Sequence, residues 1–213
     1  MILYHFLIHT ALSVGILPLL VLFSKKRAFV FKEPITPFIW LTFIATLYEG
    51  IVAIALKIDV SYWRQIYLFL EILTVFYFYF KLFQPRFKTV FRLFFALLAV
   101  TYVISFYWID NSPLVAVAIN MVSLVFFILF FSFCWVKDLF KSDEIQNLWE
   151  NPVFYFLVAF YIYYLVTMSL FLMGSFISDM SLYFYDFAIA NAMTTLILRI
   201  LLTIGIWKMK RYY

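Results

Sequence analysis

The chain has 213 residues, of which 67% are hydrophobic and 13% are charged, and its formal net charge is +5. Soluble globular domains contain about 45–50% apolar and about 25% charged residues, so this composition excludes a soluble enzyme. It also excludes intrinsic disorder, which requires low hydrophobicity. The mean hydropathy of +1.03 indicates a protein dissolved in a lipid bilayer. Charges in the loops explain the basic balance, and we expect no nucleic-acid partner.

Seven apolar runs follow one another along the chain, separated by charged clusters and prolines. They cover residues 2–23, 35–56, 62–83, 90–109, 113–136, 152–177 and 183–207. Each run has the length of about 20 residues that a helix needs to cross a bilayer core of about 30 Å. The first run lacks the basic start and the cleavage motif of a signal peptide, so we expect a retained helix. The sequence predicts an all-α polytopic membrane protein with one seven-helix domain over residues 1–213.

Lysine and arginine are distributed unequally between the two sides of the predicted bundle. One side has only Lys57 and Arg64, and Arg199 lies within the last run. The other side has Lys25, Lys26, Arg27, Lys32, Lys81, Arg86, Lys88, Arg92, Lys137, Lys141, Lys208, Lys210 and Arg211. Because basic loops stay on the cytoplasmic side, the N-terminus is predicted outside and the C-terminus inside. We expect a multi-pass protein of a cytoplasmic membrane, of bacterial type.

The longest predicted loop, residues 137–152, lies on the inner side. Within it, Ser142 followed by two acidic residues is typical of a helix start, and the next apolar residues share one side. The pattern predicts a short interfacial helix near 142–150 on the inner leaflet. It would either dock a cytoplasmic protein partner or connect two spans with its apolar side in the headgroups.

Aromatic residues make up 24% of the chain, with 29 Phe and 16 Tyr. Belts at the membrane interface explain those near the ends of the runs. They do not explain Phe76–Phe80 or Tyr161–Tyr164, which lie within runs. These segments indicate either bulky packing or an aromatic cage around a polyene cofactor. The last run has no lysine to hold retinal, and the cofactor is left unknown.

Polar side chains inside the runs are costly in hydrocarbon and usually face the bundle interior. At a rise of 1.5 Å per residue, four of them lie roughly 10–12 Å below the outer surface and a fifth lies roughly 13 Å below it. The four are His9, Glu49, Asn120 and Asn191, and the fifth is Glu71. Their common depth predicts an outward-facing polar pocket in which these five residues bind a ligand.

Three interpretations of this layer remain open. In the first, the layer binds a small ligand or a proton, and protonation of Glu49 or Glu71 shifts the helix packing. In the second, His5 and His9, which share a helix face, bind zinc or iron together with the glutamates. In the third, the groups only hydrogen-bond to one another. Arg199 lies deeper and either pairs with an acid, Glu71 being the nearest, or snorkels to the inner headgroups.

The sequence contains no Gly-x-Ser-x-Gly motif, no glycine-rich phosphate loop and no Cys-x-x-Cys pair. We therefore favour a protein that is not an enzyme. Short segments at Tyr48-Glu49, Leu70-Glu71 and Asn151–Phe154 resemble the seven-span sensing modules of bacterial two-component sensor kinases and their stand-alone relatives. The resemblance implies sensing without catalysis. No kinase domain follows before Tyr213, so we expect the signal to pass to a separate partner.

These observations lead to three hypotheses for the function. The first is a sensor that binds a small ligand or ion in the polar pocket and relays this to a cytoplasmic partner through the 137–152 loop. The second is a small-molecule or ion transporter, or a channel subunit, that uses the same glutamates. The third is an accessory subunit of a larger membrane complex or defence system.

Overall fold

All regular structure in the described part of the chain is helical. The computed structural model describes residues 2–56, 61–84, 86–108, 113–141, 148–176 and 180–210, without the side chains of 2–5, 53–54, 61–62, 64, 113, 175–176 and 180–184. The helices are α1 (Ile2–Val14), α2 (Leu17–Ser24), α3 (Thr36–Tyr48), the π-helix η1 (Glu49–Ala55), α4 (Ser61–Phe83), α5 (Lys88–Phe106), α6 (Pro113–Lys141), α7 (Pro152–Phe176) and α8 (Met180–Lys208).

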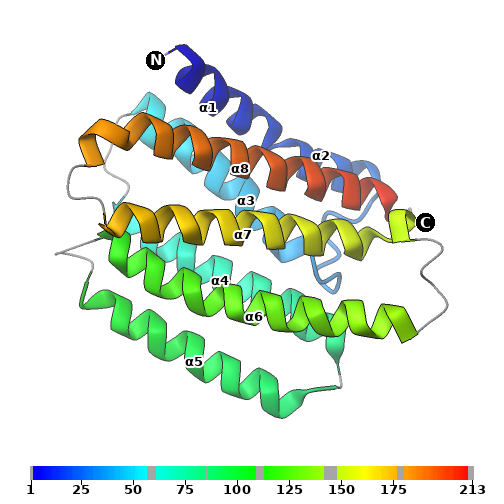
Figure 1. Cartoon of the computed structure of the whole chain (residues 1–213). Helices are drawn as coiled ribbons and strands as arrows, with labels where there is room; N and C mark the ends of the chain where they lie inside the picture. The colour runs from blue at the N-terminus through cyan, green and yellow to red at the C-terminus, as the bar shows by residue number, and fades with distance from the viewer. Residues whose placement is uncertain are drawn as a thin grey trace.

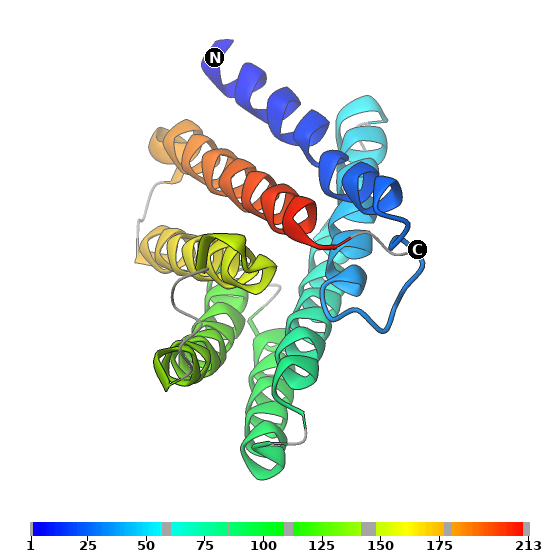
Figure 2. The ribbon, with the colours of Figure 1, turned by 90° about the vertical axis from the view of Figure 1, so that its right-hand side faces the viewer.

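The helices run side by side in two layers (Figures 1 and 2). In one layer α7 packs between α6 and α8, and α5 packs against α6 at the edge. In the other layer α4 packs against α3, while α1 and α2 pack against α8. α1 begins at one end of the bundle and α8 finishes at the opposite end (Figure 1).

The lengths and composition of the helices fit a multi-pass membrane protein. Six helical segments within the described residues are long and apolar enough to cross a membrane, and a shorter apolar helix covers Thr36–Val52. The all-α prediction is therefore confirmed. Each predicted run contains helix, but two runs contain a pair of segments: α1 and α2 share the first run, and α3 and η1 share the second.

The break between α1 and α2 has a local cause. Pro18 has no backbone N–H, so it cannot donate to the carbonyl four residues earlier, and its ring disfavours a continuous helix there. The backbone N–H of Gly15 still donates to the carbonyl of Ala11 at 2.9 Å, and α2 then begins at Leu17 with Pro18 in its first turn. The apolar run is continuous in sequence, but the helix is interrupted near its middle.

Aromatic rings fill the core between α3, α4, α5, α6 and α7. Phe91 of α5 stacks on Phe131 of α6 with ring centroids 4.1 Å apart. Phe160 of α7 meets Phe38 of α3 edge to face at 4.9 Å. Tyr79 is fully buried among these rings, and its hydroxyl hydrogen-bonds to a serine of α6. Four of the five rings in this segment, those of Phe76, Phe78, Tyr79 and Phe80, thus pack against other protein rings, as the packing interpretation expects.

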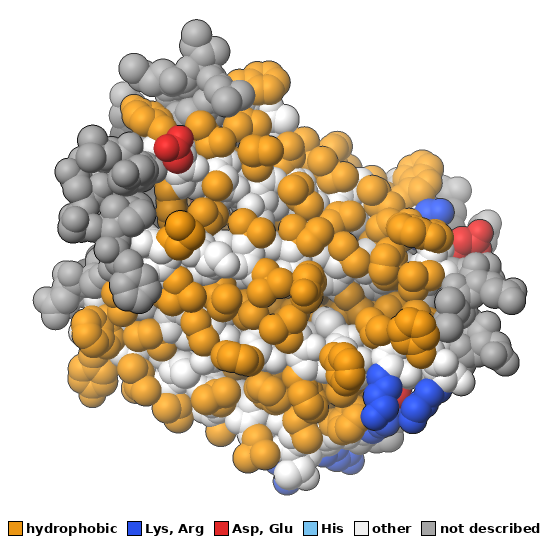
Figure 3. All heavy atoms as spheres, in the orientation of Figure 1, with side chains coloured by type: hydrophobic (Ala, Val, Ile, Leu, Met, Phe, Trp, Pro, Cys, Tyr) orange, Lys and Arg blue, Asp and Glu red, His pale blue; other side chains and the backbone are white. Residues whose placement is uncertain are grey.

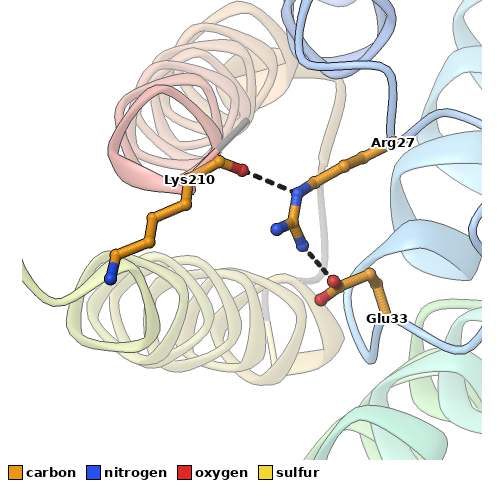
Figure 4. Close-up of polar contacts among 3 residues, drawn as sticks. All are labelled: Arg27, Glu33 and Lys210. Carbon is orange, nitrogen blue, oxygen red and sulfur yellow. Dashed lines mark hydrogen bonds and ion pairs between the residues drawn. The ribbon is translucent and has the colours of Figure 1, made fainter. Parts of the chain in front are cut away.

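The loop between α2 and α3 closes over the C-terminal end of α8 (Figure 4). Arg27 pairs with Glu33 in the same loop, and its Nε donates to the carbonyl of Lys210 at 2.8 Å. The last carbonyls of a helix have no partner within the helix, so this bond satisfies one just beyond α8. The ammonium of Lys25 lies over the ring of Trp207, 5.2 Å from its centroid.

The inner loop is shorter than its sequence indicates. α6 continues to Lys141, so residues 137–141 of the predicted 137–152 loop are helical. This last turn carries Asp138, whose carboxylate accepts a hydrogen bond from Arg86 at 2.7 Å and ties α6 to the connection between α4 and α5. The predicted interfacial helix near 142–150 falls largely on residues 142–147, which lie outside the described residues, and residues 148–150 form a single 3₁₀ turn.

Charged and apolar side chains are separated along the bundle. Figure 3 shows hydrophobic side chains across the middle of one face, and lysine and arginine side chains gathered toward its right-hand end. This is the end to which α8 leads in Figure 1. The contacts of Arg27 with the end of α8, and of Arg86 with the end of α6, bring basic segments from distant parts of the sequence to this end.

Glycine 205 allows α8 to approach α7 closely. A Cβ atom at this position would lie 2.4 Å from ring atom Cε1 of Phe156, which is itself 3% exposed and cannot move aside freely. We expect Gly205→Ala to lower the free energy of unfolding by about 1–3 kcal/mol, the usual cost of overpacking a core. Thermal or denaturant unfolding of the purified protein measures this change.

Gly50→Ala is the matched control, because a Cβ at Gly50 would meet no atom within 4 Å. Its stability should stay within about 0.5 kcal/mol of the wild type, as for other substitutions that touch nothing. Equal effects of the two substitutions would contradict the close packing of α7 on α8.

Candidate functional site

Arg199 of α8 is buried inside the bundle, with 6% of its surface exposed. Its Nη2 donates to the hydroxyl of Thr46 on α3 at 2.9 Å, and its Nη1 donates to the backbone carbonyl of Ala11 on α1. The side chain therefore does not snorkel to the inner end of the bundle. A single guanidinium connects three segments that are far apart in the sequence.

The small residues around Arg199 explain how these segments meet. Gly15 lies at the break between α1 and α2, where an added Cβ would be 2.5 Å from the Thr46 hydroxyl oxygen and 2.9 Å from the Arg199 guanidinium carbon. Only glycine fits there without displacing one of them. On α3, Thr42 and Ala45 are buried beside Thr46, each with 4% of its surface exposed. Such small-residue faces let helices approach closely in a membrane.

The Ala11 carbonyl has two lone pairs and uses both. It accepts the N–H of Gly15 at 2.9 Å and the guanidinium of Arg199. The helix break leaves backbone carbonyls near Ala11 with fewer helical partners, which favours a cation in the last turn of α1. A charged donor to a carbonyl in a water-poor interior forms a stronger hydrogen bond than a neutral one.

Glu71 of α4 lies in the interior with 1% of its surface exposed. The hydroxyl of Tyr67, one turn earlier on the same helix, donates to its carboxylate at 3.4 Å. From α7, Tyr163 and Tyr164 interact electrostatically with the same carboxylate. Three phenol groups thus surround one acidic side chain, and each phenol can either donate or accept a hydrogen bond.

Two buried hydroxyls of α7 lie outside normal hydrogen-bond geometry: that of Tyr164, next to Glu71, and that of Thr167, next to Tyr163. Tyr164 is 0% exposed and Thr167 is 1% exposed. Leaving a buried polar group unpaired costs about 1–3 kcal/mol, so two such groups on one helix need a physical explanation.

Glu49 lies between the Glu71 region and Arg199 in electrostatic terms only. It is the first residue of η1, and its side chain lies at the surface of the bundle. It is within electrostatic range of Arg199 and of the phenols of Tyr67 and Tyr163. We call this set the interior polar cluster; its members are Thr46, Glu49, Tyr67, Glu71, Tyr163, Tyr164, Thr167 and Arg199.

The interior polar cluster holds two carboxylates, one guanidinium and several hydroxyl groups. The carboxylates accept hydrogen bonds, the guanidinium donates them, and the hydroxyls do either. This combination can bind a small polar molecule, a cation or a proton. Its members come from α3, η1, α4, α7 and α8, so a ligand there would contact five helical segments at once.

Of the five predicted ligand-binding residues, Glu71 is buried on α4, and Glu49 is exposed at the start of η1, within electrostatic range of Glu71. His9 is exposed on α1. Asn120 is fully buried on α6; its amide donates to the carbonyl of Ala116 at 3.2 Å, and its side-chain oxygen has no partner. Asn191 is half-buried on α8. Among the described hydrogen bonds, none joins these three residues to Glu71.

The proposed metal site at His5 and His9 stays a prediction, because the side chain of His5 lies outside the described residues. Within the part of the chain whose side chains are described, no three His, Cys, Asp or Glu side chains come together.

Sequence reasoning missed the contributions of Tyr163, Tyr164 and Gly15. The tyrosines lie in a run of aromatic residues where their hydroxyls give no periodic signal, and the run predicts only packing or an aromatic cage. One signal in the sequence points to Tyr164: Thr167 follows it by three positions and so lies on the same helix face.

The chain matches no protein-family model, and comparisons with curated proteins and with solved structures find no match. The resemblance to sensing modules stays a prediction.

The contacts of Arg199 generate a test by double-mutant cycle. Arg199→Gln should lower the free energy of unfolding by about 2–3 kcal/mol, since it removes a charged donor from two buried acceptors. Thr46→Val, which keeps the shape but removes the acceptor, should cost about 1 kcal/mol. Because the two side chains share one hydrogen bond, the double variant should lose less than the sum, by at least about 0.5 kcal/mol. Strict additivity in denaturant unfolding would contradict the contact.

Proposed function

We propose that the chain is a seven-pass protein of a bacterial cytoplasmic membrane, with its N-terminus outside and its C-terminus inside. Three observations support this topology. Each of the seven apolar runs contains helix. α1 begins and α8 finishes at opposite ends of the bundle, as an odd number of crossings requires (Figure 1). The basic segments collect at the end where α8 finishes, which is the cytoplasmic end by the distribution of lysine and arginine.

Within this topology, the interior polar cluster binds a small ligand, an ion or a proton. The observation that carries the proposal is the buried carboxylate of Glu71 with the hydroxyl of Tyr164 next to it but outside normal hydrogen-bond geometry, and with the hydroxyl of Thr167 unsatisfied one turn further along α7. Membrane proteins rarely bury ionisable groups without using them, because hydrocarbon solvates them poorly. A bound ligand would supply the hydrogen bonds that the two hydroxyls lack and would contact Glu71.

α8 provides a physical route from this cluster to the cytoplasmic end. Its middle carries Arg199, which is bonded to α1 and α3, and its last turns are held by Lys25 and Arg27 of the α2–α3 loop. A ligand that changes the contacts of Arg199 would shift α8 against this loop. The protein would then act as a sensor that relays ligand binding to a cytoplasmic partner, with the inner 137–152 segment as part of the docking surface.

Transport is the second candidate, and the interrupted helices favour it. Transporters often bind substrate where membrane helices are broken, because such breaks free backbone groups for coordination. Here α1 is interrupted before α2, and α3 changes to the π-helix η1 at Glu49. Both irregular segments adjoin Arg199. Flux of a bound compound in liposomes would favour transport over sensing, and binding without flux would favour sensing.

The topology predicts which positions a membrane-impermeant maleimide can reach. In a Cys134→Ser background, Tyr107→Cys lies just beyond α5, where the native residue is 81% exposed, and should be labelled in intact cells. Lys141→Cys, at the opposite end on α6, should be labelled only after the cells are permeabilised. The reverse pattern would overturn the orientation, and equal labelling of both would overturn the membrane topology.

The ligand proposal predicts that binding depends on Glu71. The purified protein would be screened by thermal shift against amino acids, organic anions, and monovalent and divalent cations. A compound that stabilises the wild type should bind Glu71→Gln at least about tenfold more weakly, because a charged hydrogen-bond acceptor is lost. Glu150→Gln, an exposed acid beyond the bundle, is the matched control and should bind normally. A folded Glu49→Gln/Glu71→Gln variant with wild-type ligand binding and full biological activity would contradict the proposal.

Tyr164→Phe separates a binding role from a structural one. Because the hydroxyl of Tyr164 has no partner, its removal should raise the stability of the ligand-free protein, by about 1 kcal/mol, while weakening ligand binding. A loss of stability of similar size would show that the hydroxyl bonds within the protein, and the argument from unpartnered groups would fail.

A further inference from the structure

A groove between α4 and α5 combines apolar walls with two basic side chains. Its volume is about 390 Å³, and it is lined by Phe76, Phe80, Lys88, Phe91, Arg92 and Phe95. The groove lies on the outside of the bundle, away from the interior polar cluster. Hydrophobic residues exposed to a bilayer need no explanation, but two cations along an apolar groove do.

The aromatic walls of the groove are packed in place. Phe91 is 2% exposed and forms the floor; its ring meets those of Phe76 and Phe80 edge to face, with centroids 5.6 and 5.4 Å apart. Phe95 meets Phe76 at 5.5 Å and is itself half exposed. A hydrocarbon chain that lies against these rings would bury apolar surface on a preformed site.

The two cations lie one turn apart on α5. Lys88 and Arg92 are spaced i, i+4 and therefore share a helix face. Both side chains are exposed, and neither forms an ion pair within the described residues. The nearby acid Asp138 is already paired with Arg86. The groove therefore presents two uncompensated positive charges, one of them a guanidinium suited to bidentate phosphate binding.

The charged and the aromatic residues of the groove lie at different depths, as the headgroup and the acyl chains of a lipid do. α5 begins at Lys88, at the basic end of the bundle. At 1.5 Å per residue, Arg92 lies about 6 Å deeper than Lys88, and Phe95 lies about 10 Å deeper. On α4, Phe76 lies about 10 Å from the end of the helix at Phe83. The charges are thus at headgroup level, and the aromatic walls extend into the hydrocarbon.

We propose that this groove is a binding site for an anionic phospholipid of the inner leaflet. Lys88 and Arg92 bind the headgroup phosphate, and one acyl chain lies along Phe76, Phe80 and Phe95. The charge complementarity favours a lipid over a partner helix, which would not need two cations at the membrane surface. The site rests on the membrane topology and is independent of the ligand in the interior polar cluster.

Native mass spectrometry of the full chain in detergent tests the site with two probes, dioleoyl-phosphatidylglycerol and dioleoyl-phosphatidylcholine. The wild type should prefer the anionic lipid. Lys88→Gln/Arg92→Gln should weaken phosphatidylglycerol binding about tenfold or more, since the groove loses both of the cations that would bind the phosphate. Both residues are exposed, so the variant should unfold at the wild-type temperature in phosphatidylcholine.

The matched control is Lys137→Gln/Lys141→Gln, a second exposed pair at i, i+4 on α6 that does not line the groove. It should change phosphatidylglycerol affinity by less than about twofold, as surface substitutions outside a site do. Phe95→Ala should weaken phosphatidylglycerol binding although all charges remain, because it removes part of the apolar wall. Three results would each overturn the proposal. They are an equal loss of phosphatidylglycerol affinity in the groove variant and the control variant, no loss of affinity in the groove variant, and displacement of the lipid by an equal concentration of glycerol phosphate.

Discussion

The fold depends on a guanidinium buried where lipid offers it no hydrogen bonds. Hydrocarbon solvates neither charges nor free backbone groups, so each must find its partner within the protein. Arg199 does so by bonding the Ala11 carbonyl at the interrupted first helix and the Thr46 hydroxyl on α3. Three features make room for this contact. They are the helix break at Pro18, the absence of a side chain at Gly15, and the buried small-residue face of α3. Removal of the charge would leave the broken helix without its cross-link to the bundle.

The interior polar cluster extends this arrangement toward α4 and α7. Glu71 and its tyrosines lie within electrostatic reach of Glu49, which in turn acts on Arg199. The last turns of α8 are held by Lys25 and Arg27 at the basic end, and its middle is bonded through Arg199. In the proposed sensor, α8 would carry a displacement toward a cytoplasmic partner.

The helical class and the burial of Glu71 follow from the sequence because hydropathy and run length directly reflect lipid solvation. The break between α1 and α2 was missed because the apolar run continues through Gly15 and Pro18 without a charge. The sequence predicts an acid or the inner headgroups as partners of Arg199, whereas the structure gives it a backbone carbonyl, which no side-chain pattern reports, and the neutral hydroxyl of Thr46. The extra turn of α6 was assigned to a loop because Asp138 is charged, and its pairing with Arg86 depends on a segment some fifty positions away. For Tyr163 and Tyr164 the sequence predicts only packing or an aromatic cage, because their rings dominate any hydrophobic pattern.

The central claim is that the interior polar cluster binds a ligand through Glu71, Tyr164 and Thr167. The most direct measurement is a high-resolution map of the protein in a lipid nanodisc, with attention to the space between these three side chains. The account predicts non-protein density within hydrogen-bonding distance of the Glu71 carboxylate and of at least one of the two hydroxyls. A dry, closed layer, in which both hydroxyls bond only to neighbouring protein groups, would contradict it and make the cluster a structural feature.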